Sequence, residues 1–147
     1  ERPDLLAQLY EGHYIDWPER ARPLEEKLPF FWTIDGKTSG FSNRVFLRHG
    51  RDPEKLPPAF REALALFDEI ALRPDVRADF VLQPGEMFFW HNFLVLHSRQ
   101  QFHDTPDARR LLLRLWLNIP DGRPIHPAMR SLTAEIDAYH GGEAVPA

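Results

Sequence analysis

The sequence predicts a mainly β fold with flanking helices, of the α+β class, and three observations support this prediction. Short aromatic and aliphatic runs within residues 82–118 are too brief to be helices. Fourteen prolines are scattered along the 147 residues, which suits short strands and turns better than a helix bundle. Between Pro58 and Pro74 the apolar residues recur with a helical period, which predicts one helix packed outside the sheet.

Residues 82–118 organise the rest of the prediction. Strands are expected at residues 87–90, 93–97 and 109–118. Pro84-Gly85 precedes the first strand and is the pair favoured at the centre of a type II turn, where glycine supplies the positive φ. The break at residues 104–107 separates the second strand from the third.

The flanking segments add two helices and a hairpin. Helices are expected at residues 3–10 and 128–139, and strands at 28–34 and 41–47. Asp35-Gly36 between the two strands is a strong hairpin-turn signal. Arg44, inside the second of these strands, is interpreted as an exposed strand arginine in preference to a substrate-facing one.

Two arginines share a face of the expected strand 109–118. Alternation places Arg110 and Arg114 with Leu112 and Trp116, and five other side chains, four of them leucines, on the opposite face. A buried guanidinium requires an anion or a hydrogen-bonded partner, and its planar fork suits a carboxylate. Pairing with Asp or Glu on a neighbouring strand, or exposure to water, explains the pattern equally well.

His97 ends the second apolar run. A lone histidine in that position is more often a core or surface residue than a metal ligand, so its neighbours must decide. Those neighbours form a series of short motifs: Pro84-Gly85-Glu86-Met87, Trp90-His91-Asn92, Val95-Leu96-His97-Ser98-Arg99, Phe102, Asp104, and Arg109-Arg110-Leu111-Leu112-Leu113-Arg114-Leu115-Trp116.

This series resembles the C-terminal half of the TauD/TfdA family, the iron(II)- and 2-oxoglutarate-dependent dioxygenases. The resemblance implies a double-stranded β-helix, or jelly-roll, core. It implies that His97 is the second histidine of the metal triad and that Arg110, thirteen residues later, binds the far carboxylate of 2-oxoglutarate. Arg114 matches a second family arginine near cosubstrate or substrate. His91 departs from the usual aspartate, and we interpret it as structural.

The implied activity is oxidation of a small molecule, usually hydroxylation. Two histidines and one carboxylate leave three positions of a ferrous ion open for 2-oxoglutarate and O₂. An arginine at the closed end of the cavity would aim the keto-acid end of 2-oxoglutarate at the iron. The alternative is a catalytically inert jelly-roll module that binds a small ligand or a protein partner.

Two of the three implied metal ligands are not found in the sequence. The family's first histidine and its carboxylate come from an H-x-D or H-x-E element, which does not occur in these 147 residues. His13 and Asp16 are too far apart, whereas His103 and Asp104 are adjacent. We therefore expect residues 1–147 to be the C-terminal part of a single dioxygenase domain, with the N-terminal half supplying the missing ligands.

Composition excludes several other classes of protein. A net charge of −4 gives no reason to expect nucleic-acid binding, and no apolar run reaches the roughly 18 residues of a membrane span. Cysteine is absent, which excludes disulfides and thiolate metal sites and leaves a reducing cytoplasm as the default compartment. Signatures of nucleotide binding, zinc proteolysis and serine hydrolysis are missing.

Overall fold

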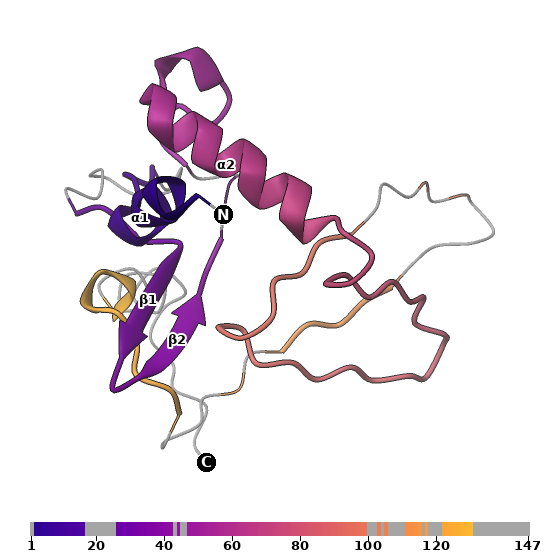
Figure 1. The fold of residues 1–147 in the computed structure, drawn as a ribbon. Helices are drawn as coiled ribbons and strands as arrows, with labels where there is room; N and C mark the ends of the chain where they lie inside the picture. Colours follow the sequence, from indigo (N-terminus) through magenta and orange to yellow (C-terminus); the bar gives the residue numbers. More distant parts are fainter. Residues whose placement is uncertain are drawn as a thin grey trace.

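The computed structural model describes residues 2–16, 26–42, 44, 47–99, 103, 105, 111–115, 117 and 122–130. Its elements follow the order α1 (Pro3–Glu11), β1 (Phe31–Ile34), β2 (Lys37–Gly40), the 3₁₀ helix η2 (Pro53–Lys55) and α2 (Pro58–Ala71). Helix α1 and the β1–β2 hairpin lie on one side of α2, and a helical turn at residues 127–130 lies beside the hairpin (Figure 1). In this part of the chain, no helix combines the length and apolar character that crossing a bilayer requires.

The hairpin confirms the turn predicted at Asp35-Gly36. Strands β1 and β2 pair antiparallel, with Ile34 opposite Lys37. Asp35 and Gly36 both have positive φ, 52° and 71°, as a two-residue type I′ turn requires. Because so short a turn starts the return strand at once, β2 begins at Lys37. The prediction of a strand at 41–47 is wrong for its described residues, 41, 42, 44 and 47, which belong to no strand.

Arg44 lies beyond β2 and joins this region to α2. Its guanidinium forms an ion pair with Asp68 and donates a hydrogen bond to the carbonyl of Leu64 at 3.1 Å. It also lies 5.9 Å from the ring centre of Phe67. The side chain is half-buried, so the expected exposed strand arginine is instead a structural link between the hairpin exit and α2.

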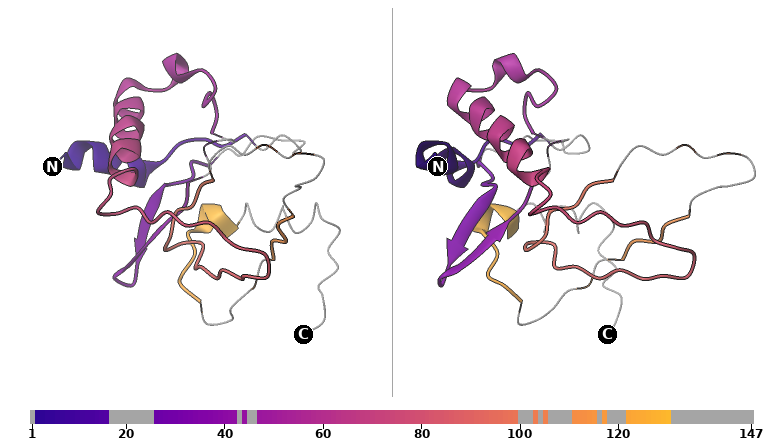
Figure 2. Two further views of the ribbon diagram at one scale, coloured as in Figure 1. Left: turned by 90° about the vertical axis from the view of Figure 1, so that its right-hand side faces the viewer. Right: turned by 45° about the vertical axis from the view of Figure 1, so that its right-hand side comes forward.

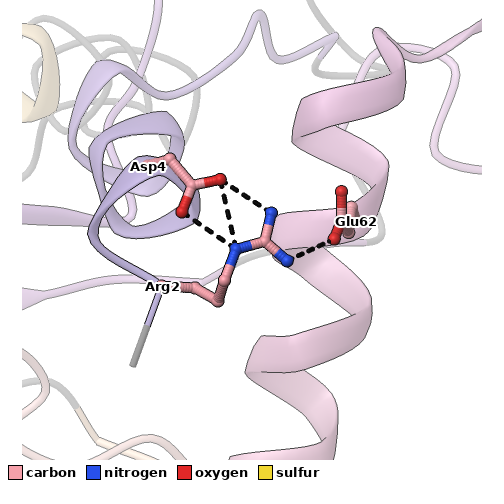
Figure 3. A network of polar contacts seen from close by, with 3 residues as sticks. All are labelled: Arg2, Asp4 and Glu62. Carbon is pink, nitrogen blue, oxygen red and sulfur yellow. Dashed lines mark hydrogen bonds and ion pairs between the residues drawn. The ribbon is translucent and has the colours of Figure 1, made fainter.

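Helices α1 and α2 confirm the predicted helical segments at 3–10 and 58–73 within two residues at each end. Gly12 ends α1 with a φ of 75°, and a Cβ there would meet the carbonyl oxygen of Leu28 at 2.2 Å, so only glycine fits. Arg2 joins the two helices, because it contacts both Asp4 and Glu62 at 2.7 Å (Figure 3). These groups are exposed, so their contribution to stability is small.

Two apolar clusters hold these elements together. In the first, the buried side chains of α1 and α2 enclose Phe30, which precedes β1; its members are Leu5, Leu9, Phe30, Leu47, Leu56, Phe60, Ala63 and Leu64. In the second, Trp32 of β1 packs against the turn at 127–130; its members are Ile15, Leu28, Trp32, Ala128 and Met129. The indole of Trp32 also donates to the carbonyl of Pro124 at 3.2 Å. The hairpin is therefore packed by α1 and α2 through one cluster and by the C-terminal segment through the other.

The strands predicted in residues 82–118 are not formed in the described part of the chain. Residues 87–90 and 93–97 form no ladder, nor do residues 111–115 and 117, the described members of the third expected strand. A strand is stabilised by a ladder of backbone hydrogen bonds to a neighbouring strand, and the described residues form no such ladder beside these segments. The turn at Pro84-Gly85 is confirmed, since Gly85 has a φ of 88° and the Glu86 amide donates to the Gln83 carbonyl at 3.0 Å.

These segments run away from the helices and the hairpin and leave their apolar side chains in solvent (Figure 2). Met87, Leu113 and Leu115 are each more than 80 % exposed. The hairpin is the only sheet among the described residues, so they do not display a jelly roll. Of the last predicted helix, at 128–139, residues 128–130 are helical and 131–139 lie outside the described part.

His13 is a half-buried titratable group beside the first cluster. Its backbone exchanges hydrogen bonds with Leu28 at 3.2 and 3.0 Å, and its ring stacks on Phe60 with centres 5.0 Å apart. Its Nε2 is buried and has no hydrogen-bond partner in the described residues. Burial, followed by the positive charge of Lys27, lowers the pKa of His13 below its ordinary value.

The lowered pKa of His13 predicts acid-sensitive stability. The unfolded chain takes up this proton near pH 6.5, whereas the folded protein resists it, so the free energy of unfolding should fall as the pH drops through 6.5. Above that pH the contribution is constant. We expect His13→Gln to flatten this dependence, measured as urea midpoints between about pH 7.5 and 5.5. Equal pH dependence in both proteins would contradict the assignment.

Candidate functional site

A turn at residues 91–94 attaches the central stretch to the hairpin. The amide of Gly40, the last residue of β2, donates to the carbonyl of Phe93 at 2.9 Å. The Phe93 ring meets Trp32 edge to face, with centres 5.5 Å apart. Within the turn, the amide of Leu94 donates to the His91 carbonyl at 3.0 Å. His97 follows this anchor by four residues, so the hairpin sets where its backbone lies.

His91 contributes to the same turn through its side chain. Its Nδ1 accepts a hydrogen bond from the amide of Phe93 at 3.2 Å. The ring thus caps the turn that holds Phe93 against the hairpin. This contact supports the interpretation of His91 as a structural residue.

A row of three aromatic rings leads to His97. The ring centres of Phe80 and Phe88 are 4.7 Å apart, and Phe88 stacks on Trp90 at 5.2 Å with an interplanar angle of 26°. Trp90 then contacts the imidazole of His97 at 4.8 Å and 58°. Such offset and tilted pairs are the arrangements that aromatic rings prefer. The row gives the end of this otherwise exposed segment a fixed set of side-chain neighbours.

Arg114 joins the same group from a distant part of the sequence. Its guanidinium carbon lies 5.9 Å from the centre of the Trp90 ring, within cation–π range. Trp90 therefore contacts both His97 and Arg114, which are seventeen positions apart in the chain. Partial burial, and then the charge of Arg114, lower the pKa of His97 below its ordinary value.

This environment suits a metal-binding imidazole. A metal ligand must present an unprotonated nitrogen, and the lowered pKa of His97 favours its neutral form. The side chain is also exposed, so an ion can reach it. No group of three His, Cys, Asp or Glu side chains lies close enough to hold a metal among the residues the structure describes. His97 can therefore supply one ligand of a larger set.

The structure brings together two of the three site residues predicted from the sequence. His97 and Arg114 both contact Trp90, whereas Arg110 lies outside the described residues. The roles of all three remain predictions. The sequence prediction missed the row formed by Phe80, Phe88 and Trp90, although the i, i+2 spacing of Phe88 and Trp90 was a usable signal for a shared face.

A hollow between α1 and α2 contains none of these residues. Its volume is about 280 Å³, and its lining comprises Arg2, Leu5, Glu62, Ala65, Leu66 and Glu69. It is open to solvent and mixed in polarity, without a cluster of ligating groups. The chemistry-bearing side chains are gathered around Trp90 instead.

Comparison with known proteins identifies the family. Residues 1–116 match the family described as taurine catabolism dioxygenase TauD, TfdA family. The chain belongs to the TauD/TfdA family. The resemblance predicted from the motifs around His97 is thereby confirmed. No solved structure shows a significant match.

Two longer curated proteins are similar to this TauD/TfdA chain. FR-33289 synthase of Streptomyces rubellomurinus (strain ATCC 31215) is 33 % identical over 134 residues, which cover 84 % of the chain and 39 % of the relative. Uridine-5'-phosphate dioxygenase of a Streptomyces species is 40 % identical over 63 residues, which cover 42 % of the chain and 23 % of the relative. The chain thus spans about two fifths of the first relative and about a quarter of the second.

Proposed function

We propose that the protein is an iron(II)- and 2-oxoglutarate-dependent dioxygenase that hydroxylates a small molecule while 2-oxoglutarate is decarboxylated to succinate. The observation that carries this proposal is the TauD/TfdA match over residues 1–116, which includes the segment bearing His97 and Arg114. The local chemistry supports it, because a neutral, exposed imidazole lies close to a guanidinium on a shared aromatic ring.

His97 would be one iron ligand in this proposal. Its neutral imidazole offers a nitrogen lone pair, and the Trp90 contact restricts the ring's orientation. Bound iron would supply the activation of O₂ that oxidises the substrate. The residues of this chain would hold the metal and cosubstrate in register and limit water near the reacting atoms.

Arg110 would anchor the distal carboxylate of 2-oxoglutarate. A guanidinium can donate two parallel hydrogen bonds to a carboxylate, which fixes orientation as well as position. Arg114 would assist there or bind an anionic group of the substrate. The second role is supported by the relative named uridine-5'-phosphate dioxygenase, whose named compound carries a phosphate. We therefore propose an anionic small molecule as the substrate class.

The remaining ligands and the complete jelly roll are proposed to come from additional polypeptide of the same domain. Residues 1–147 would form its C-terminal part, and an N-terminal part would supply an H-x-D or H-x-E element. The chain's 39 % share of FR-33289 synthase supports this, as does the exposure of Leu111, Leu113, Leu115 and Leu117 at 71–86 %. Leucines on one face of an extended segment are stabilised when a second layer covers them.

A catalytically inert binding module is the second candidate. It is favoured by one observation, namely that the described residues contain no group of three metal-ligating side chains. The two candidates differ in a direct way, because only the dioxygenase should bind iron and 2-oxoglutarate together.

Removal of His97 tests the metal site. Under anaerobic conditions, iron(II) plus 2-oxoglutarate should give a weak visible charge-transfer band with the natural full-length protein, and His97→Ala should abolish it because one ligand is lost. His103→Ala is a matched control, since His103 is also exposed and lies outside the ring row. A band that persists in His97→Ala would refute the ligand assignment.

Substitution of Arg110 tests the cosubstrate anchor. Loss of a charge-assisted bidentate contact costs about 1.5–3 kcal/mol, so Arg110→Ala should weaken 2-oxoglutarate binding by roughly 10- to 150-fold, measured by titration of the same band. Arg110→Lys keeps the positive charge but loses the planar guanidinium, so its affinity for 2-oxoglutarate should lie between those of the unsubstituted protein and Arg110→Ala. Arg77→Ala, which removes an exposed arginine paired with Asp79, should leave binding unchanged. Unchanged affinity in Arg110→Ala would contradict the assignment.

Hydrogen exchange tests the proposed cover over the third segment. If further polypeptide pairs with residues 111–117, their amides should exchange at least about 100-fold more slowly in the natural full-length protein than in residues 1–147 alone. The α2 amides of Ala63 and Leu64 provide the reference, because a helix satisfies its own backbone hydrogen bonds and these residues are buried in it. Equal, rapid exchange of residues 111–117 in both proteins would refute the pairing.

A further inference from the structure

We propose that Trp90 is a positioning residue that holds the imidazole of His97 and the guanidinium of Arg114 in one arrangement at the iron site. The proposal rests on the function proposed above, because it assumes that His97 binds iron. It adds a residue that touches neither metal nor cosubstrate. Its basis is the placement of one indole ring against both groups.

The first support is that Trp90 is the ring that contacts His97 in the described part of the chain. No hydrogen bond to either ring nitrogen of His97 is found among the described residues, and its side chain is exposed. Metal-binding histidines are ordinarily oriented by a partner on the second nitrogen. Here the indole of Trp90 lies 4.8 Å from the imidazole of His97, measured between ring centres. This contact restricts the side-chain torsions of His97.

The second support is that Trp90 is itself held in place. Phe88 stacks on it at 26°, and Phe80 packs against Phe88 at 4.7 Å. The backbone beyond Trp90 enters the turn anchored by Phe93 on the hairpin. Trp90 is half-buried, unlike Phe89 beside it, which is 72 % exposed. A ring supported from both directions can act as a fixed surface for mobile neighbours.

The third support is that Trp90 contacts both a cation and His97. The ring face attracts the guanidinium of Arg114 at 5.9 Å, which keeps a positive charge close to His97. An anion bound beside the metal would meet that charge. Removal of the indole should therefore loosen two groups at once, although they belong to separate segments.

The first experiment measures geometry in the metal-free, natural full-length protein. The Trp90 ring current should shift the NMR signals of the His97 ring protons. Trp90→Leu should remove this shift, whereas Phe89→Leu, which alters the exposed neighbour, should preserve it. Circular dichroism and thermal midpoints identify any general loss of structure. An unchanged His97 spectrum in Trp90→Leu would overturn the proposal without reference to iron.

The second experiment measures binding of iron(II) and 2-oxoglutarate through the charge-transfer band. Loss of residues that orient a ligand typically weakens metal binding 10- to 100-fold, so Trp90→Leu should weaken it by at least about tenfold. Trp90→Phe should weaken it less, because a ring remains, and Phe89→Leu should have no effect. If Trp90→Leu does not fold, Trp90→Phe decides, and unchanged binding in that variant overturns the proposal.

The results separate this proposal from the proposed function. If His97→Ala abolishes the band while Trp90→Leu binds normally, the function stands and the positioning role is wrong. If His97→Ala leaves the band intact, the iron assignment fails and the positioning role fails with it. Weakened binding in Trp90→Leu, together with a lost ring-current shift and an unchanged thermal midpoint, is the result expected.

Discussion

The attachment of the 91–94 turn to the hairpin is the contact on which the candidate site depends. It consists of the hydrogen bond from the Gly40 amide to the Phe93 carbonyl and the edge-to-face packing of Phe93 on Trp32. Trp32 is in turn held within a buried cluster and by its bond to the Pro124 carbonyl. This anchor connects the segment from Trp90 to His97 with the packed part of the molecule.

The anchored turn lies between Trp90 and His97, whose contact defines the chemistry of the candidate site. On the two sides of the turn, ring packing replaces sheet pairing as the restraint, since Phe80, Phe88 and Trp90 before the turn contact His97 after it without a ladder. Partial burial of His97 disfavours its charged form, and Arg114 acts in the same direction. The result is a neutral imidazole beside a permanent cation. That pairing suits a site that binds a metal through nitrogen and an anion through a guanidinium.

The exposed apolar residues show how the packed and unpacked parts of the chain differ. Helices satisfy their own backbone hydrogen bonds, so α1 and α2 form and pack wherever an apolar partner is near. Strands depend on neighbours that can be remote in the sequence. The described residues of segments 87–97 and 111–117 have the composition of strands but form no ladder, and most of their apolar side chains are exposed. A second layer of sheet would cover the same leucines that strand alternation assigns to one face.

The sequence by itself determined the local elements and the family. Helix punctuation by Pro58 and Gly12, and the paired positive φ at Asp35-Gly36, are local constraints, so α1, α2 and the hairpin turn were predictable. The spacing of His97, Arg110 and Arg114 along the sequence predicted the TauD/TfdA family, because such spacing can be read without knowledge of the fold. Only the tertiary structure decided that β2 ends at Gly40, that Arg44 pairs with Asp68, and that Trp90 lies between His97 and Arg114. Those outcomes depend on contacts between distant segments, which residue type and periodicity do not specify.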